Sequence, residues 1–157
     1  MTVGNDPEKD MAQSSVARAQ MVLYSIAAFI SLIGLADATY LTVTHLTGDD
    51  LVCGSGGCSA VLSSVYASVG PIPTAAFGAL AYFSAFSAAI LAAFGYARAR
   101  IFLMLVVAGM FVVTLGLLYL QAFVLHAFCP YCLFSAALTF LLAGLVVATP
   151  SFRRSRR

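Results

Sequence analysis

Long apolar stretches dominate the chain, and short polar segments separate them. Four stretches consist mainly of apolar residues, at about 21–44, 73–95, 101–125 and 130–149. A bilayer core about 30 Å thick needs roughly 20 such residues if a helix is to cross it. The pattern therefore predicts an all-α integral membrane protein, a four-transmembrane-helix bundle with little chain left for a soluble domain.

The two ends of the chain are polar. Residues 1–20 carry several charged side chains, and residues 150–157 are basic. No small-residue cleavage site follows a short apolar core, so the first span is expected to be an anchor and not a cleaved signal. We therefore expect a polar, disordered tail over 1–20, a membrane domain over 21–149 and a basic tail over 150–157.

The composition supports the same class. With 62% hydrophobic and 9% charged residues and a mean hydropathy of +0.99, the chain cannot be an ordinary soluble domain. The net charge of +2 argues for neither a nucleic acid nor an acidic ligand.

The distribution of positive charge predicts the orientation. Segments 45–72 and 126–129 contain no Lys or Arg, whereas the other three polar segments hold all eight: Lys9, Arg18, Arg98, Arg100, Arg153, Arg154, Arg156 and Arg157. Cytoplasmic loops retain such residues. We expect both termini in the cytoplasm and the first and third connections outside.

Four cysteines form two closely spaced pairs in these two outer connections. Cys53 and Cys58 lie in the first, and Cys129 and Cys132 in the third. Disulfides can form and persist outside the cytosol. Rings this small constrain the unfolded chain only weakly, so they are poor structural staples. The spacing favours redox-active pairs gathered at one membrane face.

The second pair coincides with the start of the fourth apolar stretch. Pro130 suits a first helical position because its φ is fixed and it lacks an amide hydrogen. The positive end of a helix favours thiolate over thiol, and thiolate is the reactive species. Soluble CxxC redox folds place the motif after a strand in a βαβ unit. Here apolar helices flank it, which excludes that fold.

The first outer connection has two parts. Residues 48–57 are glycine-rich and would let the Cys53 and Cys58 pair swing. Within residues 59–69, apolar positions recur at helical spacing: Val61, Leu62, Val65, Tyr66 and Val69. We predict a short amphipathic helix here, ended by the prolines that follow. It would cover the mouth of the bundle as a lid.

Several motifs resemble the bacterial branch of the vitamin K epoxide reductase (VKOR) family. The similarity covers about residues 20 to 148 and is carried by Cys53, Gly57-Cys58-Ser59, Val61-Leu62-Ser63-Ser64, Tyr66-Ala67, Gly70-Pro71-Ile72-Pro73, Gly78, Tyr119-Leu120 and Phe128-Cys129-Pro130-Tyr131-Cys132. The other quinone-linked four-helix thiol oxidase, the DsbB type, carries its CxxC in the first outer loop. This chain has the reverse order.

The resemblance implies a role for each cysteine. Cys129 and Cys132 would be the active-site pair, with Cys132 facing a quinone, ubiquinone or menaquinone, as electron acceptor. Cys58 would exchange with Cys129, and Cys53 would receive electrons from a thioredoxin-fold (DsbA-like) protein. No fused thioredoxin-like domain is expected. The implied function is a thiol oxidoreductase of the bacterial inner membrane that supports disulfide formation in exported proteins.

Other residues are candidates for quinone binding or proton handling. We expect a pocket lined by apolar and aromatic side chains such as Phe77, Phe123 and Phe128. Asp37 is the only acid inside a span, and a carboxylate there is a functional candidate because its burial is costly. It could handle quinone protons or could be a packing residue. Gln121 is a similar candidate, and a weaker proton role is open for two histidines at the ends of helices, His45 and His126.

Two other functions stay open. Four outward cysteines could bind zinc or an iron–sulfur cluster, since CxxC is also a metal-pair spacing. The glycine-rich CxxxxC makes a poor second half of such a site, so no metal is expected. A structural bundle with inert disulfides is the other alternative.

Overall fold

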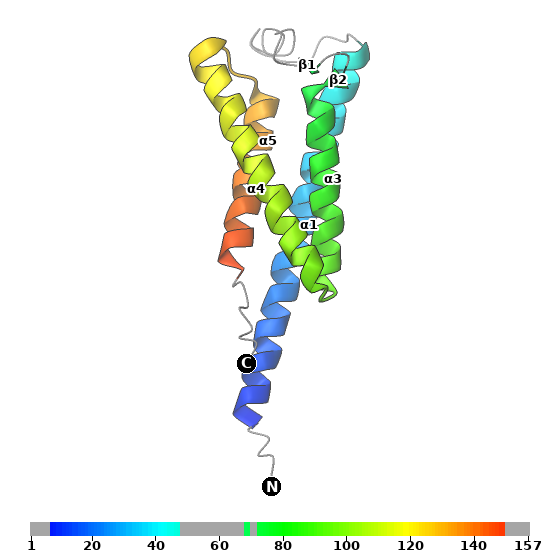
Figure 1. The fold of residues 1–157 in the computed structure, drawn as a ribbon, viewed down its shortest axis with the longest axis vertical. Helices are drawn as coiled ribbons and strands as arrows, with labels where there is room; N and C mark the ends of the chain where they lie inside the picture. The colour runs from blue at the N-terminus through cyan, green and yellow to red at the C-terminus, as the bar shows by residue number, and fades with distance from the viewer. Residues whose placement is uncertain (1–6, 48–67, 70–71, 150–157) are drawn as a thin grey trace.

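A computed structural model describes residues 7–47, 68–69 and 72–149 of the chain (Figure 1). The regular structure of these residues consists of four long helices, one π-helical turn and an antiparallel ribbon of two short strands. In chain order the elements are α1 (Pro7–Thr47), β1 (Ser68–Val69), β2 (Ile72–Pro73), α3 (Thr74–Ala93), α4 (Ala97–Tyr119), the π-helical turn η1 (Leu120–Val124) and α5 (Pro130–Ala148).

The predicted membrane bundle is confirmed. In the described part of the chain, four helices are long and apolar enough to cross a bilayer, over 14–47, 74–93, 97–124 and 130–148. Many of their large apolar side chains are exposed on the outside of the bundle. Such a surface suits lipid, since hydrocarbon tails solvate Leu and Phe as well as a protein core does.

The first helix begins much earlier than the sequence pattern suggests. α1 starts at Pro7 and not near residue 21, so the expectation of a disordered tail is wrong from Pro7 onward. The reason is local. Residues 8–20 contain Ala, Gln, Met, Glu, Lys and Arg, which favour helix without being apolar, and proline is well placed at a first helical position.

Of the lid helix predicted over 59–69, the structure describes only residues 68 and 69. Its last two residues, Ser68 and Val69, form β1 and pair with Pro73 and Ile72 of β2, so the helix expected over 59–69 does not include them. Strand pairing requires extended backbone, which a helix lacks. Residues 59–67 lie outside the described residues, as do Cys53 and Cys58.

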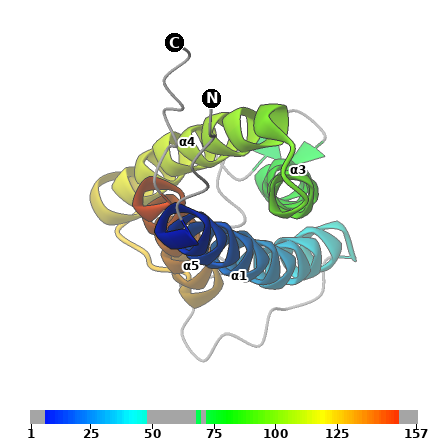
Figure 2. The same cartoon turned by 90° about the horizontal axis from the view of Figure 1, so that it is seen from below.

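The helices form a closed ring. α1 packs on α3 and α5, and α4 packs on the same two helices, so that α1 and α4 face each other across the bundle (Figure 2). The β1–β2 ribbon and the connection between α4 and α5 lie at one end (Figure 1). The start of α1 and the end of α5 point the other way. The first and third connections are therefore at the same end, as the alternation of four spans requires.

Small residues let α3 approach its neighbours closely. Ala85, Ala88, Ala89 and Ala92 are all buried, and small side chains at an interface are the usual means by which membrane helices come into van der Waals contact. The exception is Tyr82, a large side chain that is only 2% exposed. It precedes the buried alanines, one turn before Ala85 on α3.

Tyr82 ties α3 to α5 and presses on α1. Its hydroxyl donates to the backbone carbonyl of Ser135 at 2.8 Å and lies 3.1 Å from Ser135 Oγ and 3.0 Å from Thr139 Oγ1. Its ring occupies the space where Gly34 of α1 would carry a Cβ. Glycine at position 34 is therefore required by the tyrosine, because any other side chain would meet the ring.

Replacement of Gly34 by alanine should destabilise the bundle. The added methyl group overlaps the Tyr82 ring, and overpacking of this kind typically costs about 1–3 kcal/mol. The matched control is Gly109→Ala, since a Cβ at Gly109 meets nothing within 4 Å. Thermal unfolding in detergent should show a lower Tm for Gly34→Ala alone. Equal Tm values for both variants would contradict the packing described here.

Candidate functional site

The CxxC sequence forms the beginning of α5. Cys129 is the residue that precedes the helix, with extended backbone angles (φ −97°, ψ 116°), and Pro130 is the first helical residue. The Cys129 carbonyl accepts the Leu133 amide at 3.0 Å. Both thiols are free, with Cys129 buried and Cys132 partly buried. The expected coincidence of helix start and thiol pair is confirmed.

A π-helical turn at the end of α4 brings Gln121 to this pair. Gln121 is only 4% exposed, and its side-chain oxygen accepts the Cys129 amide at 3.4 Å. A π-helical turn holds one extra residue and so changes which side chains face the neighbouring helix; such turns often occur at functional sites. Gln121 therefore positions the backbone of Cys129.

The short connection between η1 and α5 closes on the same residue. The Gln121 carbonyl accepts the Ala127 amide at 3.2 Å. His126 adopts a left-handed conformation with φ of 47°, which is uncommon for a residue other than glycine and reverses the chain locally. The side chain of His126 is exposed. The connection thus leads directly into the CxxC pair.

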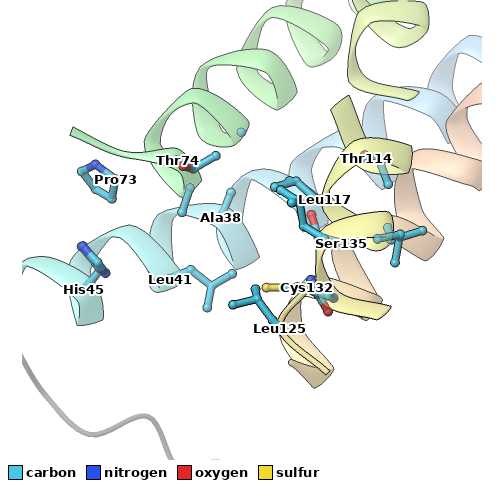
Figure 3. A pocket seen from close by; sticks show the side chains of 16 residues that line it. Ala38, Leu41, His45, Pro73, Thr74, Thr114, Leu117, Leu125, Cys132 and Ser135 are labelled. Carbon is cyan, nitrogen blue, oxygen red and sulfur yellow. The ribbon is translucent and has the colours of Figure 1, made fainter. Parts of the chain in front are cut away.

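A cavity of about 140 Å³ lies beside Cys132, between the four helices at this end of the bundle (Figure 3). Its described lining is mostly aliphatic and includes a few polar groups. The lining residues are Ala38, Leu41, His45, Pro73, Thr74, Ala75, Gly78, Thr114, Leu117, Leu118, Leu120, Gln121, Leu125, Cys132, Ser135 and Ala136.

The size and chemistry of this cavity suit a flat, apolar ring. A cavity of about 150 Å³ lined by apolar side chains can hold one benzene molecule. Ligand sites combine an apolar wall with a small number of polar groups that fix orientation. Thr74, Thr114, Gln121 and Ser135 supply hydroxyl and amide groups here, and Cys132 supplies a thiol. A quinone head group, a six-membered ring with two carbonyl oxygens, fits this donor set.

The structure brings some of the predicted site residues together and separates others. Cys132 and Gln121 both line the cavity. Phe77, Phe123 and Phe128 do not; they are 46%, 67% and 55% exposed. The reason is helical register for Phe77, which precedes the lining residue Gly78 and so points away from it. Phe123 stacks on Tyr119 outside the cavity. The aromatic lining expected from the sequence is replaced by aliphatic side chains.

Sequence reasoning also missed polar residues of the cavity wall. Ser135 follows Cys132 by three residues, and helical spacing alone could have placed both on one face. Thr74 follows the Gly-Pro-Ile-Pro motif directly. Nothing in the sequence marks Thr114, which lies in an apolar stretch. Of the two histidines, His45 lines the cavity.

The electrostatics distinguish the two thiols. A hydrogen bond donated by the Cys132 thiol lowers the pKa of Cys129 from its ordinary value of 9.0 to about 6, and the backbone amides of Cys132 and Tyr131 act in the same direction. Burial and the charge of Asp37 oppose this shift. Cys129 is therefore the thiolate of the reduced pair at neutral pH, and Cys132 holds the thiol proton. Such a pair can form a disulfide by giving up two electrons and one proton.

Asp37 lies close to the pair but does not line the cavity. Its carboxyl group lies within electrostatic reach of Cys129, Cys132 and the Tyr82 hydroxyl. Its Oδ2 atom is buried and has no hydrogen-bond partner among the described residues. An intramembrane carboxylate left in this state is costly, which marks it as a candidate for function.

The low pKa of Cys129 is directly measurable. In a reduced Cys53→Ser, Cys58→Ser variant, the thiolate absorbance at 240 nm should appear as the pH rises through about 6. Adding Cys132→Ala removes the hydrogen-bond donor, so the midpoint should move up toward the ordinary value. The same high midpoint with and without Cys132 would show that the hydrogen bond does not stabilise the thiolate.

A comparison with protein-family models identifies the chain. The model described as the vitamin K epoxide reductase family matches residues 25–147, which takes in all four membrane helices and the CxxC pair. This family comprises membrane oxidoreductases that work with quinones and thiol partners. The chain, a multi-pass membrane protein with a free thiol pair beside a ring-sized cavity, belongs to the vitamin K epoxide reductase family.

Proposed function

We propose that the protein is a quinone-dependent thiol–disulfide oxidoreductase that reoxidises an exported thioredoxin-fold thiol oxidase and so supports disulfide formation in exported proteins. The observation that carries the proposal is the position of Cys132, whose free thiol lines a ring-sized apolar cavity and hydrogen-bonds to the Cys129 thiolate. A thiol so placed can give electrons to a ring in the cavity. The adjacent thiolate can complete the disulfide.

The electrons would travel along the two cysteine pairs toward the cavity. Thiol–disulfide exchange proceeds by thiolate attack through a mixed disulfide. A reduced partner would give its electrons to the Cys53 and Cys58 pair, and Cys58 would then reduce Cys129–Cys132. Buried Cys129 is the sulfur away from the cavity wall, which leaves Cys132 to face the acceptor. This order agrees with the geometry of the described pair.

A quinone would be held by the lining of the cavity. Leu117, Leu118 and Leu125 would contact the ring faces, and the polar groups of Thr74, Gln121 and Ser135 line the same space and would face its carbonyl oxygens. When bound, the quinone supplies an acceptor for two electrons and two protons. The free energy follows the potential difference, about 1.4 kcal/mol for each 30 mV in a two-electron reaction. The same walls exclude water from the exchange.

The proposal includes an orientation in the membrane. Both cysteine-bearing connections contain no Lys or Arg, whereas residues 1–20, the connection between α3 and α4 with the start of α4, and residues 150–157 contain all eight. The positive-inside rule then assigns the CxxC end to the extracytoplasmic face and both termini to the cytoplasm. An exported thiol protein would reach the Cys53 and Cys58 pair from that side.

Substitution of single cysteines should separate the two pairs. Cys129→Ala or Cys132→Ala should abolish quinone reduction with any thiol donor, because the reacting pair is lost. Cys53→Ala or Cys58→Ala should block a reduced thioredoxin-fold donor while sparing dithiothreitol, which is small enough to reach the inner pair. The measurement is quinol production by anaerobic proteoliposomes, recorded spectroscopically.

The control for that experiment is a matched pair of donors on the same preparation. If all four variants lose the same activity with dithiothreitol, the division into an outer and an inner pair is wrong. If the wild-type protein forms no quinol with either donor, the proposed function itself is wrong.

A further inference from the structure

The sequence leaves few positive charges for the CxxC end of the bundle. It has no Lys or Arg between Arg18 and Arg98, and none between Arg100 and Arg153. Arg98 and Arg100 stand at the start of α4, at the opposite end from the cavity. Between Arg18 and Arg153, the other groups that can become cationic are His45 and His126. His126 is exposed.

The titratable groups around Asp37 are otherwise neutral or acidic. Tyr82 on α3 and Cys129 and Cys132 at the start of α5 interact with Asp37. Tyr40, one turn beyond Asp37 on α1, contacts Tyr131 of α5. His45 lies eight residues beyond Asp37 along the same helix, about 12 Å at 1.5 Å per residue. No cation among the described residues therefore adjoins the Asp37 carboxyl group.

Two negative charges cannot easily coexist at this place. An ionised carboxylate and a thiolate close together in a weakly polar interior repel each other, and each also loses its hydration. The Cys129 thiolate is held by the Cys132 thiol and by backbone amides. Oδ2 of Asp37 has no such donor among the described residues. The negative charge of the reduced site therefore belongs on sulfur.

We propose that Asp37 carries a proton while Cys129 is a thiolate, and that it releases this proton toward the cavity when the pair is oxidised. The inference rests on the proposed function for the destination of the proton. The new element is the source of the proton, Asp37, a residue that does not itself line the cavity.

The proposal balances the reaction. Formation of the Cys129–Cys132 disulfide from one thiolate and one thiol releases two electrons and the Cys132 proton. Conversion of a quinone into a quinol takes up two electrons and two protons, so one proton is missing. Asp37 supplies it and becomes a carboxylate once the thiolate charge has gone. When a partner dithiol reduces the pair again, it brings two protons, one for Cys132 and one for Asp37.

Hydroxyl groups lie between this side of α1 and the cavity wall. Gly34, one turn before Asp37, lies against the Tyr82 ring. The Tyr82 hydroxyl lies 3.1 Å from Ser135 Oγ, and Ser135 lines the cavity beside Cys132. Hydroxyl groups both donate and accept hydrogen bonds. Under the proposal, the Tyr82 and Ser135 hydroxyls would pass the proton on once the Asp37 side chain turns toward Tyr82.

Infrared spectroscopy can test, without any quinone, whether Asp37 loses its proton when the Cys129 thiolate is oxidised. The Cys53→Ser, Cys58→Ser variant is titrated electrochemically, so that only the inner pair changes state. Oxidation of the pair should remove a carboxylic acid C=O stretching band, and this change should be absent with Asp37→Asn and shifted in frequency with Asp37→Glu. A redox difference spectrum with no such band would overturn the proposal, whether or not the variants fold.

Kinetics test the delivery of the proton. In proteoliposomes with dithiothreitol as donor, Asp37→Asn should slow quinol production by about 10²-fold, at the lower end of what a positioned general acid contributes. The remaining rate should fall as the pH rises above 7, because the missing proton must come from water. The wild-type rate should depend less on pH in this range.

Two further variants complete the experiment. Ser31→Ala removes a buried hydroxyl of the same helix, whose one hydrogen bond within the described part of the chain goes to the Ala27 carbonyl at 2.8 Å. This variant should keep the wild-type rate. Tyr82→Phe should keep the infrared change but lose rate. A wild-type rate and pH profile in Asp37→Asn would overturn the proposal, and a wild-type rate in Tyr82→Phe would overturn the route. If the wild-type protein produces no quinol, the proposed function is wrong, while the infrared result on Asp37 would still stand.

Discussion

The hydrogen bonds of Tyr82 are the constraint on which the arrangement of this bundle depends. Lipid surrounds the helices, so burial of apolar side chains does little to decide which faces meet. Close packing and a few interhelical hydrogen bonds have to do so. Tyr82 provides both, since its ring needs the space left by Gly34 and its hydroxyl joins Ser135 and Thr139 of α5. Ser135 is one turn beyond Cys132, so the contact that fixes α3 against α5 also fixes the reactive sulfur against the cavity.

The chemistry at this end depends on a second local device, the π-helical turn. A regular continuation of α4 would present different side chains to α5. The turn instead places the Gln121 side-chain oxygen on the Cys129 amide, where it fixes the residue that precedes α5. The thiolate is then held by the first turn of its own helix and by its partner thiol. The neighbouring thiol, together with backbone amides and without a charged side chain, lowers the pKa of Cys129.

Much of this could be predicted from the sequence, and the rest could not for identifiable reasons. Spans of about 20 apolar residues and a proline after Cys129 are local signals, so the helices and the placement of the CxxC pair followed from them. The extent of α1 was missed because residues 7–20 favour helix through propensity and not through hydropathy. The cavity wall was misjudged because hydropathy does not say which face of a lipid-exposed helix turns inward. Phe77 and Gly78 are neighbours in sequence, yet only Gly78 lines the cavity.

The cavity lies between helices that cross the hydrocarbon layer, and its wall is largely aliphatic. An acceptor that reaches it is dissolved in the bilayer, whereas a protein donor is dissolved in water. With the proposed function, the protein would therefore meet one substrate in two dimensions and the other in three. Its Michaelis constant for the acceptor would then be a mole fraction in lipid. Added detergent or phospholipid lowers the mole fraction of the acceptor, and so the rate, even when the amount of acceptor per volume of solution is constant.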